Sequence, residues 1–395
     1  MAMTENLILA ERLQRIPAYP FAAISKRVRQ LVGQGLDVIQ LDIGSPDLPP
    51  PPACVDALCE SAANPKRHGY GGFSGTPELR QAFASYYSRR FGVPLDPERE
   101  VLPLLGSKEG IVNIHLALIN PGDIVLVPDP CYTAYQRAPI LAGGEPFPVP
   151  LDPTKGFLPA LDQIPANVIR RARLLWINYP NNPTGAVATL DDYELIVAFC
   201  RKNNIMLCSD NPYADVTFDG AHAPSVLEVS GAKDLAVEFN SISKTFNMAG
   251  WRIGVCVGNA DMIDALLRIK SNIDSGLFNV IQDAACVALT TVSESWIRSR
   301  NRVYEERRDV VLSNLDRIGL RAVVPLGGLY VWAAIDTGSD EDYVRGALEE
   351  AHVSLSPGSI YGPSGRNYVR ISLVVDTARM LEAINRLAQW YRSRN

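Results

Sequence analysis

The sequence predicts an α/β fold in which a mostly parallel sheet lies between helices, and three observations lead to this prediction. Short apolar runs alternate with longer amphipathic stretches through the middle of the chain, as strands and crossover helices do. The apolar runs are rich in Val, Ile and Leu, which is typical of strands covered on both faces. The chain has 395 residues, enough for about two or three domains.

The strands and helices of the large sheet are predicted from apolar runs and capping residues. One helix is expected to begin after Thr189, with Asp192 completing the cap, and to end at 203–204. Another follows Gly106, where His115 falls on the apolar face and is expected to be a core histidine. The expected strands are 101–104, 124–127, 174–178, 205–209, 235–240 and 253–257.

The two ends of the chain predict a second, smaller unit. A helix is expected near 25–34, and the prolines at 49–52 are expected to be extended and to stay outside any helix. After about residue 285 the pattern changes to a long helix, short strands near 329–334 and 368–373, and a final helix at 377–390. The predicted division is an amino-terminal segment, 1–48, packed with the small domain, a large domain, 49–285, and a small α+β domain, 286–395.

Charge makes nucleic acid and membrane surfaces poor candidates for partners. The formal net charge is −5, from 38 basic and 43 acidic residues, and the sequence pI is about 5.5, so no overall basic field exists. The densest charge cluster, 298–308, interleaves arginines with Glu305 and Glu306 at helical spacing. We expect it to be a solvated helix face.

The cysteines and the apolar runs indicate a chain in a reducing compartment. Seven cysteines are scattered without a Cys-x-x-Cys pair or a nearby histidine cluster, so neither a disulfide framework nor a metal site is expected. No apolar stretch approaches the roughly 20 residues of a membrane span, and 1–15 is unlike a signal peptide. The expected location is the cytoplasm.

Polar motifs follow several of the predicted strands. The turn at 106–110, Gly-Ser-Lys-Glu-Gly, can bind an anion at a helix N-terminus or simply cap that helix. Lys244, in Ser-Ile-Ser-Lys-Thr at 241–245, precedes Arg252 by eight residues, and nearby cations favour an unprotonated, nucleophilic lysine. The loops 178–185 and 210–213 follow two further strands. Ligands bind outside the carboxyl ends of such strands, so these loops are expected to line one site.

These residues, in this order and spacing, resemble the class I/II aminotransferases, which are pyridoxal 5'-phosphate (PLP) enzymes of fold type I. The resemblance covers about 21–391. Its most specific parts are Asn-Pro-Thr-Gly at 182–185, Asp210 with Tyr213, Ser-x-Ser-Lys at 241–244 with Arg252, and Arg370. It implies a large domain with a mostly parallel mixed sheet between helices, a smaller α+β domain, and PLP as the cofactor.

The resemblance implies a role for each residue that contacts the PLP ring. Lys244 would join the cofactor aldehyde and later move a proton at the substrate α-carbon. Asp210 would hold the ring nitrogen protonated, since a carboxylate favours the cationic form. Asn182 and Tyr213 would bond to the ring hydroxyl, and Tyr132 would stack on the ring face.

The resemblance also implies an anion site at each end of the ligand. Ser107, Lys108, Ser241, Ser243 and Arg252 would bind the phosphate. At the other end Arg370, with Asn182 and the backbone of Gly44, would hold the substrate α-carboxylate in bidentate fashion. Tyr70 matches a tyrosine that reaches the phosphate of the neighbouring subunit, which implies a homodimer.

The expected reaction is ping-pong transamination between an amino acid and a 2-oxo acid. The loop 271–279 has no arginine for a side-chain carboxylate and resembles the LL-diaminopimelate and alanine aminotransferase branch. We therefore expect LL-2,6-diaminopimelate with 2-oxoglutarate, in lysine biosynthesis. Alanine or broad-specificity transamination, or a PLP-dependent carbon–sulfur lyase on the same fold, stay open. A transcription regulator with an aminotransferase-like domain is the least favoured, because it needs a basic DNA-binding head.

Overall fold

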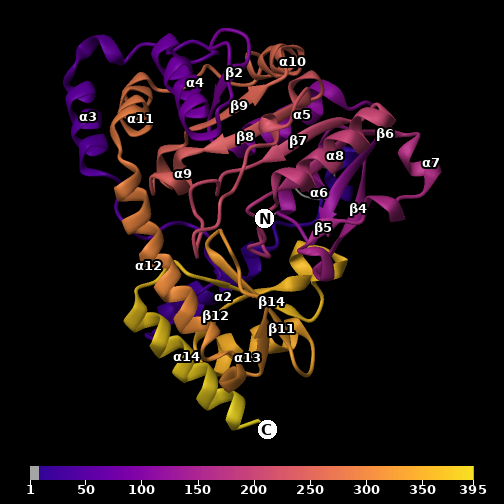
Figure 1. The fold of residues 1–395 in the computed structure, drawn as a ribbon. Helices are drawn as coiled ribbons and strands as arrows, with labels where there is room; N and C mark the ends of the chain where they lie inside the picture. Colours follow the sequence, from indigo (N-terminus) through magenta and orange to yellow (C-terminus); the bar gives the residue numbers. More distant parts are fainter. Residues whose placement is uncertain (1–8, 395) are drawn as a thin grey trace.

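The computed structural model describes residues 9–394, which contain a large mixed sheet, a four-stranded antiparallel sheet and a two-stranded ribbon (Figure 1). In the large sheet the strand order is β2-β9-β8-β7-β6-β3-β4-β5. The central strands are parallel, whereas β9 and β5 run antiparallel to their neighbours. The strands are β2 (Val101–Leu104), β3 (Ile124–Asp129), β4 (Glu145–Asp152), β5 (Leu158–Pro159), β6 (Ala172–Asn178), β7 (Met206–Asp210), β8 (Ala236–Ser241) and β9 (Gly254–Gly258).

Helices cover both faces of this sheet, which confirms the predicted fold class. In β6 the side chains of Leu175 and Ile177 join one core cluster, and those of Leu174 and Trp176 join another. The first cluster includes residues of α4 (Pro77–Phe91), α8 (Leu190–Asn203) and α11 (Asn279–Thr291), and the second residues of α5 (Ser107–Leu118), α6 (Thr133–Leu141) and α10 (Ala260–Lys270). Strands buried on both faces explain the continuous apolar runs in the sequence.

The predicted strands all exist, and their ends differ by only a few residues from the expected ones. The capping box at Thr189 and Asp192 is present, and α8 ends at Asn204 in the left-handed conformation. His115 is buried in the core, as predicted. Its Nε2 accepts a hydrogen bond of 3.0 Å from Trp176 Nε1, and burial lowers its pKa to about 4.

The sequence did not predict β4, because Pro146, Pro148 and Pro150 alternate along it. Alternate residues of a parallel strand face opposite neighbours. Glu145 donates its N–H to Asp123 O at 2.8 Å, on the side of β4 that faces β3. The three prolines therefore face the opposite side, where β5 pairs only with the end of β4. Proline is tolerated there because no ladder hydrogen bond is lost.

The antiparallel sheet lies below the large sheet in Figure 1, in the order β10-β11-β14-β13. Its strands are β10 (Leu320–Ala322), β11 (Tyr330–Ile335), β13 (Ser356–Pro357) and β14 (Tyr368–Ser372), and its helices are α12 (Glu294–Leu312), α13 (Asp340–Glu350) and α14 (Thr377–Arg392). The amino-terminal segment joins this part of the chain: β1 (Ile39–Gln40) pairs with β12 (Val353–Ser354), and Arg27 of α2 (Phe21–Gly33) pairs with Glu349.

The long helix expected after about residue 285 is present as α12, and Ser293 caps its start by accepting a hydrogen bond from Trp296 N. One expected boundary is wrong. The proline run does not stay outside helices, because Pro52 is the first residue of α3 (Pro52–Ala63). The first helical position has no intrahelical acceptor for an N–H, so proline fits there. Short helices lie at α1 (Glu11–Arg15), α7 (Ala166–Ile169) and α9 (Ile242–Thr245).

The expectation of a solvated helix face at 298–308 is also wrong. Arg300, Arg307 and Arg308 are buried on α12. Arg307 pairs with Asp47 at 2.8 Å, and Arg308 pairs with Asp219 at 2.5 Å. Both partners lie far away in the sequence, so helical spacing alone gave no sign of them. Separately, no helix between residues 9 and 394 is long and apolar enough to span a membrane.

Candidate active site

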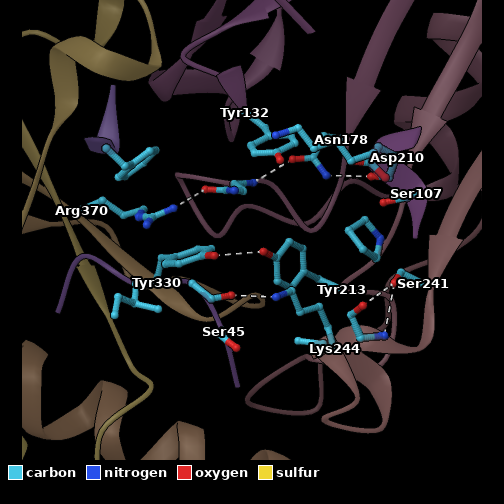
Figure 2. A pocket seen from close by; sticks show the side chains of 18 of the residues that line it. Ser45, Ser107, Tyr132, Asn178, Asp210, Tyr213, Ser241, Lys244, Tyr330 and Arg370 are labelled. Atoms are coloured by element: carbon cyan, nitrogen blue, oxygen red, sulfur yellow. Dashed lines mark hydrogen bonds between the residues drawn. The ribbon is translucent and has the colours of Figure 1, made fainter. Parts of the chain in front are cut away.

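A cavity of about 420 Å³ lies between the large sheet and the antiparallel sheet (Figure 2). It is found at the carboxyl ends of β6, β7 and β8, as expected for an open α/β sheet, and residues of β11 and β14 line its other side. All predicted site residues except Tyr70 line it. They are Gly44, Ser107, Lys108, Tyr132, Asn182, Asp210, Tyr213, Ser241, Ser243, Lys244, Arg252 and Arg370.

Lys244 presents its amine to the cavity from α9, directly after β8. Its Nζ donates a hydrogen bond of 2.7 Å to the backbone oxygen of Gly44. Burial lowers the pKa of Lys244 to about 8, and Arg252 and Arg370 act in the same direction. About a tenth of the amine is therefore unprotonated at pH 7, far more than for an ordinary lysine, and this fraction is able to attack a carbonyl carbon.

Asp210, the last residue of β7, is a buried carboxylate with one unused oxygen. Its Oδ2 accepts a hydrogen bond of 2.5 Å from Tyr135 OH, and its backbone oxygen accepts one of 2.7 Å from Asn178 Nδ2. Its Oδ1 is buried and has no hydrogen-bond partner among residues 9–394. A buried acceptor without a partner is costly, so this oxygen is suited to a ligand that brings an N–H group.

The burial of Asp210 makes the stability of the ligand-free protein depend on pH. Burial raises its pKa from 3.8 to about 7, against the hydrogen bond from Tyr135, so the folded protein holds this proton more tightly than the unfolded chain. The resulting stabilisation is complete below the unfolded pKa and is lost as pH rises through about 7. Asp210→Asn does not titrate, so its melting temperature relative to wild type should rise from about pH 5 to about pH 8.

The control for this prediction is Asp264→Asn, which alters an exposed carboxylate paired with Arg268 on one face of α10. The difference in melting temperature between this variant and wild type should stay nearly constant over the same range. A constant difference for Asp210→Asn as well would show that Asp210 is ionised throughout and that its burial has no such effect.

An anion cradle lies at the phosphate-binding end that the sequence predicted. Ser107 is the first residue of α5, whose N-terminus carries free N–H groups and a partial positive charge. The hydroxyl oxygens of Ser241 and Ser243 lie 2.8 Å apart. Burial lowers the pKa of Lys108, helped by the charges of Arg137 and Arg252. Hydroxyls, N–H groups and cations together fit a phosphate dianion.

The loop at Gly106 is shaped to admit Arg252. Gly106 has φ +75°, and a Cβ at this position would lie 2.1 Å from Arg252 Nη2. Arg252 itself has φ 60° and donates from Nη1 to Ala249 O at 2.8 Å. No carboxylate within residues 9–394 pairs with Arg252, so its guanidinium is available for an anionic ligand.

The asparagines of the loop after β6 hold that loop in shape. Asn182 N donates to Asn178 Oδ1 at 2.8 Å, and Asn181 Oδ1 accepts from Thr184 N at 3.0 Å. As a result the side chain of Asn182 faces Arg370, whose Nη1 donates to Asn182 Oδ1 at 3.2 Å. This contact joins the large sheet to β14 across the cavity.

Arg370 is buried on β14 without a carboxylate partner among residues 9–394. Its Nη2 donates to Asp42 O at 2.7 Å, and its Nε has no partner in that part of the chain. Figure 2 shows Arg370 on one side of the cavity and Ser107 and Ser241 on the other. The cavity thus offers one anion site at each end, with Lys244 and Asp210 between them.

Tyr70 is not brought into this cavity. Its side chain is 91% exposed, and none of its atoms lines the cavity. The neighbouring Gly72 forms an isolated bridge with Gly276, so the segments around residues 70 and 276 lie side by side. Tyr70 therefore does not contact the cavity of its own chain.

Sequence reasoning missed several residues that line the cavity: Asp42, Tyr135, Asn178, Tyr330 and Tyr361. A signal existed for Tyr135, which is three residues from Tyr132 at the start of α6 and so lies on the same helix face. Asn178 stands in the loop motif but received no role. Tyr330, Tyr361 and Asp42 carry no local signal, because only the pairing of distant segments brings them here.

Comparisons with known proteins find relatives that match nearly the whole chain. The family described as aminotransferase class I and II matches residues 36–387. A protein named LL-diaminopimelate aminotransferase from Moorella thermoacetica is 47% identical over 379 residues, covering 96% of this chain and 97% of that protein. One of the same name from Desulforudis audaxviator is 46% identical over 383 residues, covering 97% of each. The solved substrate-bound structure of BacF from Bacillus subtilis has a TM-score of 0.93 at 37% identity and covers 98% of both chains.

Proposed function

The chain belongs to the class I and II aminotransferases, and from this premise we propose that it binds PLP in the cavity and exchanges an amino group between an amino acid and a 2-oxo acid. One observation carries the proposal. A partly buried lysine of lowered pKa and a buried aspartate with an unused oxygen face one cavity that has an anion site at each end. PLP supplies an aldehyde that reacts with amines and a ring that withdraws electrons from the substrate α-carbon.

The proposed binding of PLP uses residues of this chain whose unused groups match it. Asp210 Oδ1 would accept the ring N–H, which would satisfy the orphan oxygen and return Asp210 to its ionised form. The phosphate would lie in the cradle of Ser107, Lys108, Ser241, Ser243 and Arg252. Tyr213 and Asn182 would donate to the ring hydroxyl, and Tyr132 would cover the ring face.

Lys244 and Arg370 would act on the substrate. The amine of Lys244 would join the cofactor aldehyde at rest and carry the proton between the α-carbon and the cofactor during the reaction. Arg370, with Asn182 and the backbone at Gly44, would hold the α-carboxylate and so orient the bond that breaks.

For the substrates we propose LL-2,6-diaminopimelate and 2-oxoglutarate, which would place the enzyme in lysine biosynthesis. The names of the relatives support this proposal, as does the lack of an arginine in the loop 271–279. Alanine or broad-specificity transamination is the alternative for the amino donor.

The assembly and location of the enzyme are further proposals. We propose a homodimer in which Tyr70 reaches the partner's cavity, because Tyr70 and the nearby Phe73, Ile273 and Phe278 are all exposed. We propose that the amino-terminal segment, 1–48, packs with the small domain, 286–395, and that 49–285 forms the large domain. All seven cysteines are free thiols, which supports a reducing cytoplasm.

A half-reaction panel tests the proposed function. The PLP-loaded protein is mixed with one amino acid at a time, and conversion of the cofactor to its amino form is read from the absorbance spectrum. LL-2,6-diaminopimelate should convert it fastest, and 2-oxoglutarate should reverse the change. Faster conversion by alanine would select the alternative donor. Release of pyruvate and thiol from cystathionine, without conversion, would select the carbon–sulfur lyase instead.

Replacing Arg370 with lysine is expected to weaken substrate binding far more than it slows chemistry. A point charge cannot reproduce the two parallel hydrogen bonds of the guanidinium fork. The loss of one charged hydrogen bond should raise KM for the amino donor roughly 10- to 100-fold, with kcat changed much less. Steady-state kinetics measures this split. The matched control is Arg379→Lys, because Arg379 pairs with Asp37 outside the cavity, and it should leave both constants unchanged. An unchanged KM for Arg370→Lys would show that Arg370 does not bind the substrate α-carboxylate.

A further inference from the structure

Tyr330 lies where three parts of the site meet, although no local motif marks it. It is the first residue of β11, and its side chain is buried. Its neighbours in space are Arg370 on β14, Tyr213 after β7 and Gly44 after β1. Figure 2 shows Tyr330 facing Tyr213, with Arg370 on the same side of the cavity as Tyr330.

The ring of Tyr330 supports the guanidinium of Arg370. Arg370 Cζ lies 3.9 Å from the centre of this ring, compared with 5.1 Å for Tyr361 and 5.7 Å for Phe21. A cation over a ring face within about 6 Å is attracted to it, and more strongly when both are buried. Arg370 has no carboxylate partner among residues 9–394, so Tyr330 is the closest aromatic support for a buried charge.

The hydroxyl of Tyr330 is held by a second set of contacts. It lies 3.1 Å from the hydroxyl of Tyr213, and the two rings meet nearly edge to face at 75°. A Cβ at Gly44 would lie 2.1 Å from the Tyr330 hydroxyl, so glycine is required there for Tyr330 to reach Tyr213. The backbone oxygen of Gly44 in turn accepts the hydrogen bond from Lys244.

We propose that Tyr330 is a positioning residue that orients two groups of the site, the guanidinium of Arg370 and the hydroxyl of Tyr213. Its ring fixes the fork of Arg370 for the substrate carboxylate, and its hydroxyl donates to Tyr213 so that Tyr213 directs its own proton toward the cofactor oxygen. The proposal rests on the proposed function. It predicts that the ring and the hydroxyl have separate effects, which two substitutions can divide.

The first test measures carboxylate binding without any reaction. Calorimetric titration of the PLP-loaded protein with glutarate, which has no amino or oxo group to react, gives Kd for each variant. Tyr330→Leu, which removes the ring, should raise Kd about tenfold, whereas Tyr330→Phe should change it less than about twofold. Tyr343→Phe is the matched control, because it removes a buried hydroxyl of the same part of the chain that donates to Ile318 O outside the cavity. It should bind glutarate as wild type does.

The second test measures the hydroxyl. Without a donor from Tyr330, Tyr213 becomes a weaker donor, and the anionic form of the cofactor oxygen is less stabilised. In Tyr330→Phe the pH at which the absorbance of bound PLP changes should therefore rise by about 0.5 unit, with no such rise in Tyr343→Phe. Gly44→Ala should cause a similar rise in the wild-type background and a smaller one on top of Tyr330→Phe, because it displaces the same hydroxyl.

Equal Kd values for Tyr330→Leu and wild type, or equal spectral midpoints for Tyr330→Phe and wild type, would overturn the corresponding half of the proposal. Thermal melts check folding, and if Tyr330→Leu does not fold, Tyr330→Met takes its place. Glutarate binding and the spectral midpoint do not depend on which amino acid is the donor. If the half-reaction panel fails but these differences appear, the proposed substrate is wrong and the role of Tyr330 stands.

Discussion

Replacing Lys244 with alanine is expected to lower turnover by about 10⁴-fold, near the upper end of what a positioned acid–base group contributes. The variant loses both the amine that would join the cofactor aldehyde and the group that would carry the proton. Among the residues described, Lys108 is the one other lysine that lines the cavity. It belongs to the anion cradle, so its amine is not available to replace that of Lys244. The measurement is the rate of cofactor conversion in a single half-reaction with the best donor.

The control for this prediction is Lys233→Ala. Lys233 is a half-buried lysine that pairs with Glu100 at 3.0 Å, outside the cavity. It should keep wild-type turnover and the wild-type spectrum of bound PLP. If Lys244→Ala kept more than about a tenth of wild-type turnover, Lys244 would not be the proton carrier, because such groups supply at least about 100-fold.

Replacing Asp210 with asparagine is expected to lower kcat by about 10²- to 10³-fold, the usual cost of removing one electrostatic group from a closed site. The carboxamide can still reach the ring nitrogen, but it carries no charge to keep that nitrogen protonated. The ring then withdraws electrons less strongly from the α-carbon. The affinity for PLP should fall as well, and both quantities come from titration with PLP followed by single-turnover kinetics.

Tyr135→Phe separates the charge of Asp210 from its surroundings. This variant keeps the carboxylate but removes the hydroxyl that donates to Oδ2. The effect on kcat should be about tenfold at most, because only one hydrogen bond is lost. If Tyr135→Phe and Asp210→Asn were equally damaging, the position of the Asp210 side chain, rather than its charge, would govern the rate.

The elements that local sequence determines were predicted well. Runs such as 101–104 and 174–177 are apolar throughout, which predicts strands covered on both faces, and the structure has such strands there. Thr189 and Asp192 bond to each other's backbone within one turn, so the start of α8 can be found without any distant residue. The proline-rich strand β4 was not predicted, because proline is unfavourable in a strand unless one side of that strand is nearly free of hydrogen-bonded neighbours.

The residues of the candidate site divide in the same way. Lys244 and Asp210 stand in short motifs at the ends of strands, and parallel strands bring such ends together. Asp42 and Tyr330 reach the cavity only because β11 pairs with β14 and β1 pairs with β12, which no spacing in the sequence reveals. The burial of Arg300 on α12 also depends on segments far away in the sequence, because its guanidinium donates to the backbone oxygens of Lys244 and Asp215.

The most direct test of the proposed chemistry asks which amine meets the cofactor. The PLP-loaded protein is treated with borohydride, which makes permanent any bond between a lysine and the cofactor aldehyde, and its peptides are analysed by mass spectrometry. The added mass should lie on the peptide that contains Lys244 and be lost in Lys244→Ala. A modified peptide that contains another lysine, or no modified peptide at all, would contradict the assignment of Lys244 and with it the proposed reaction.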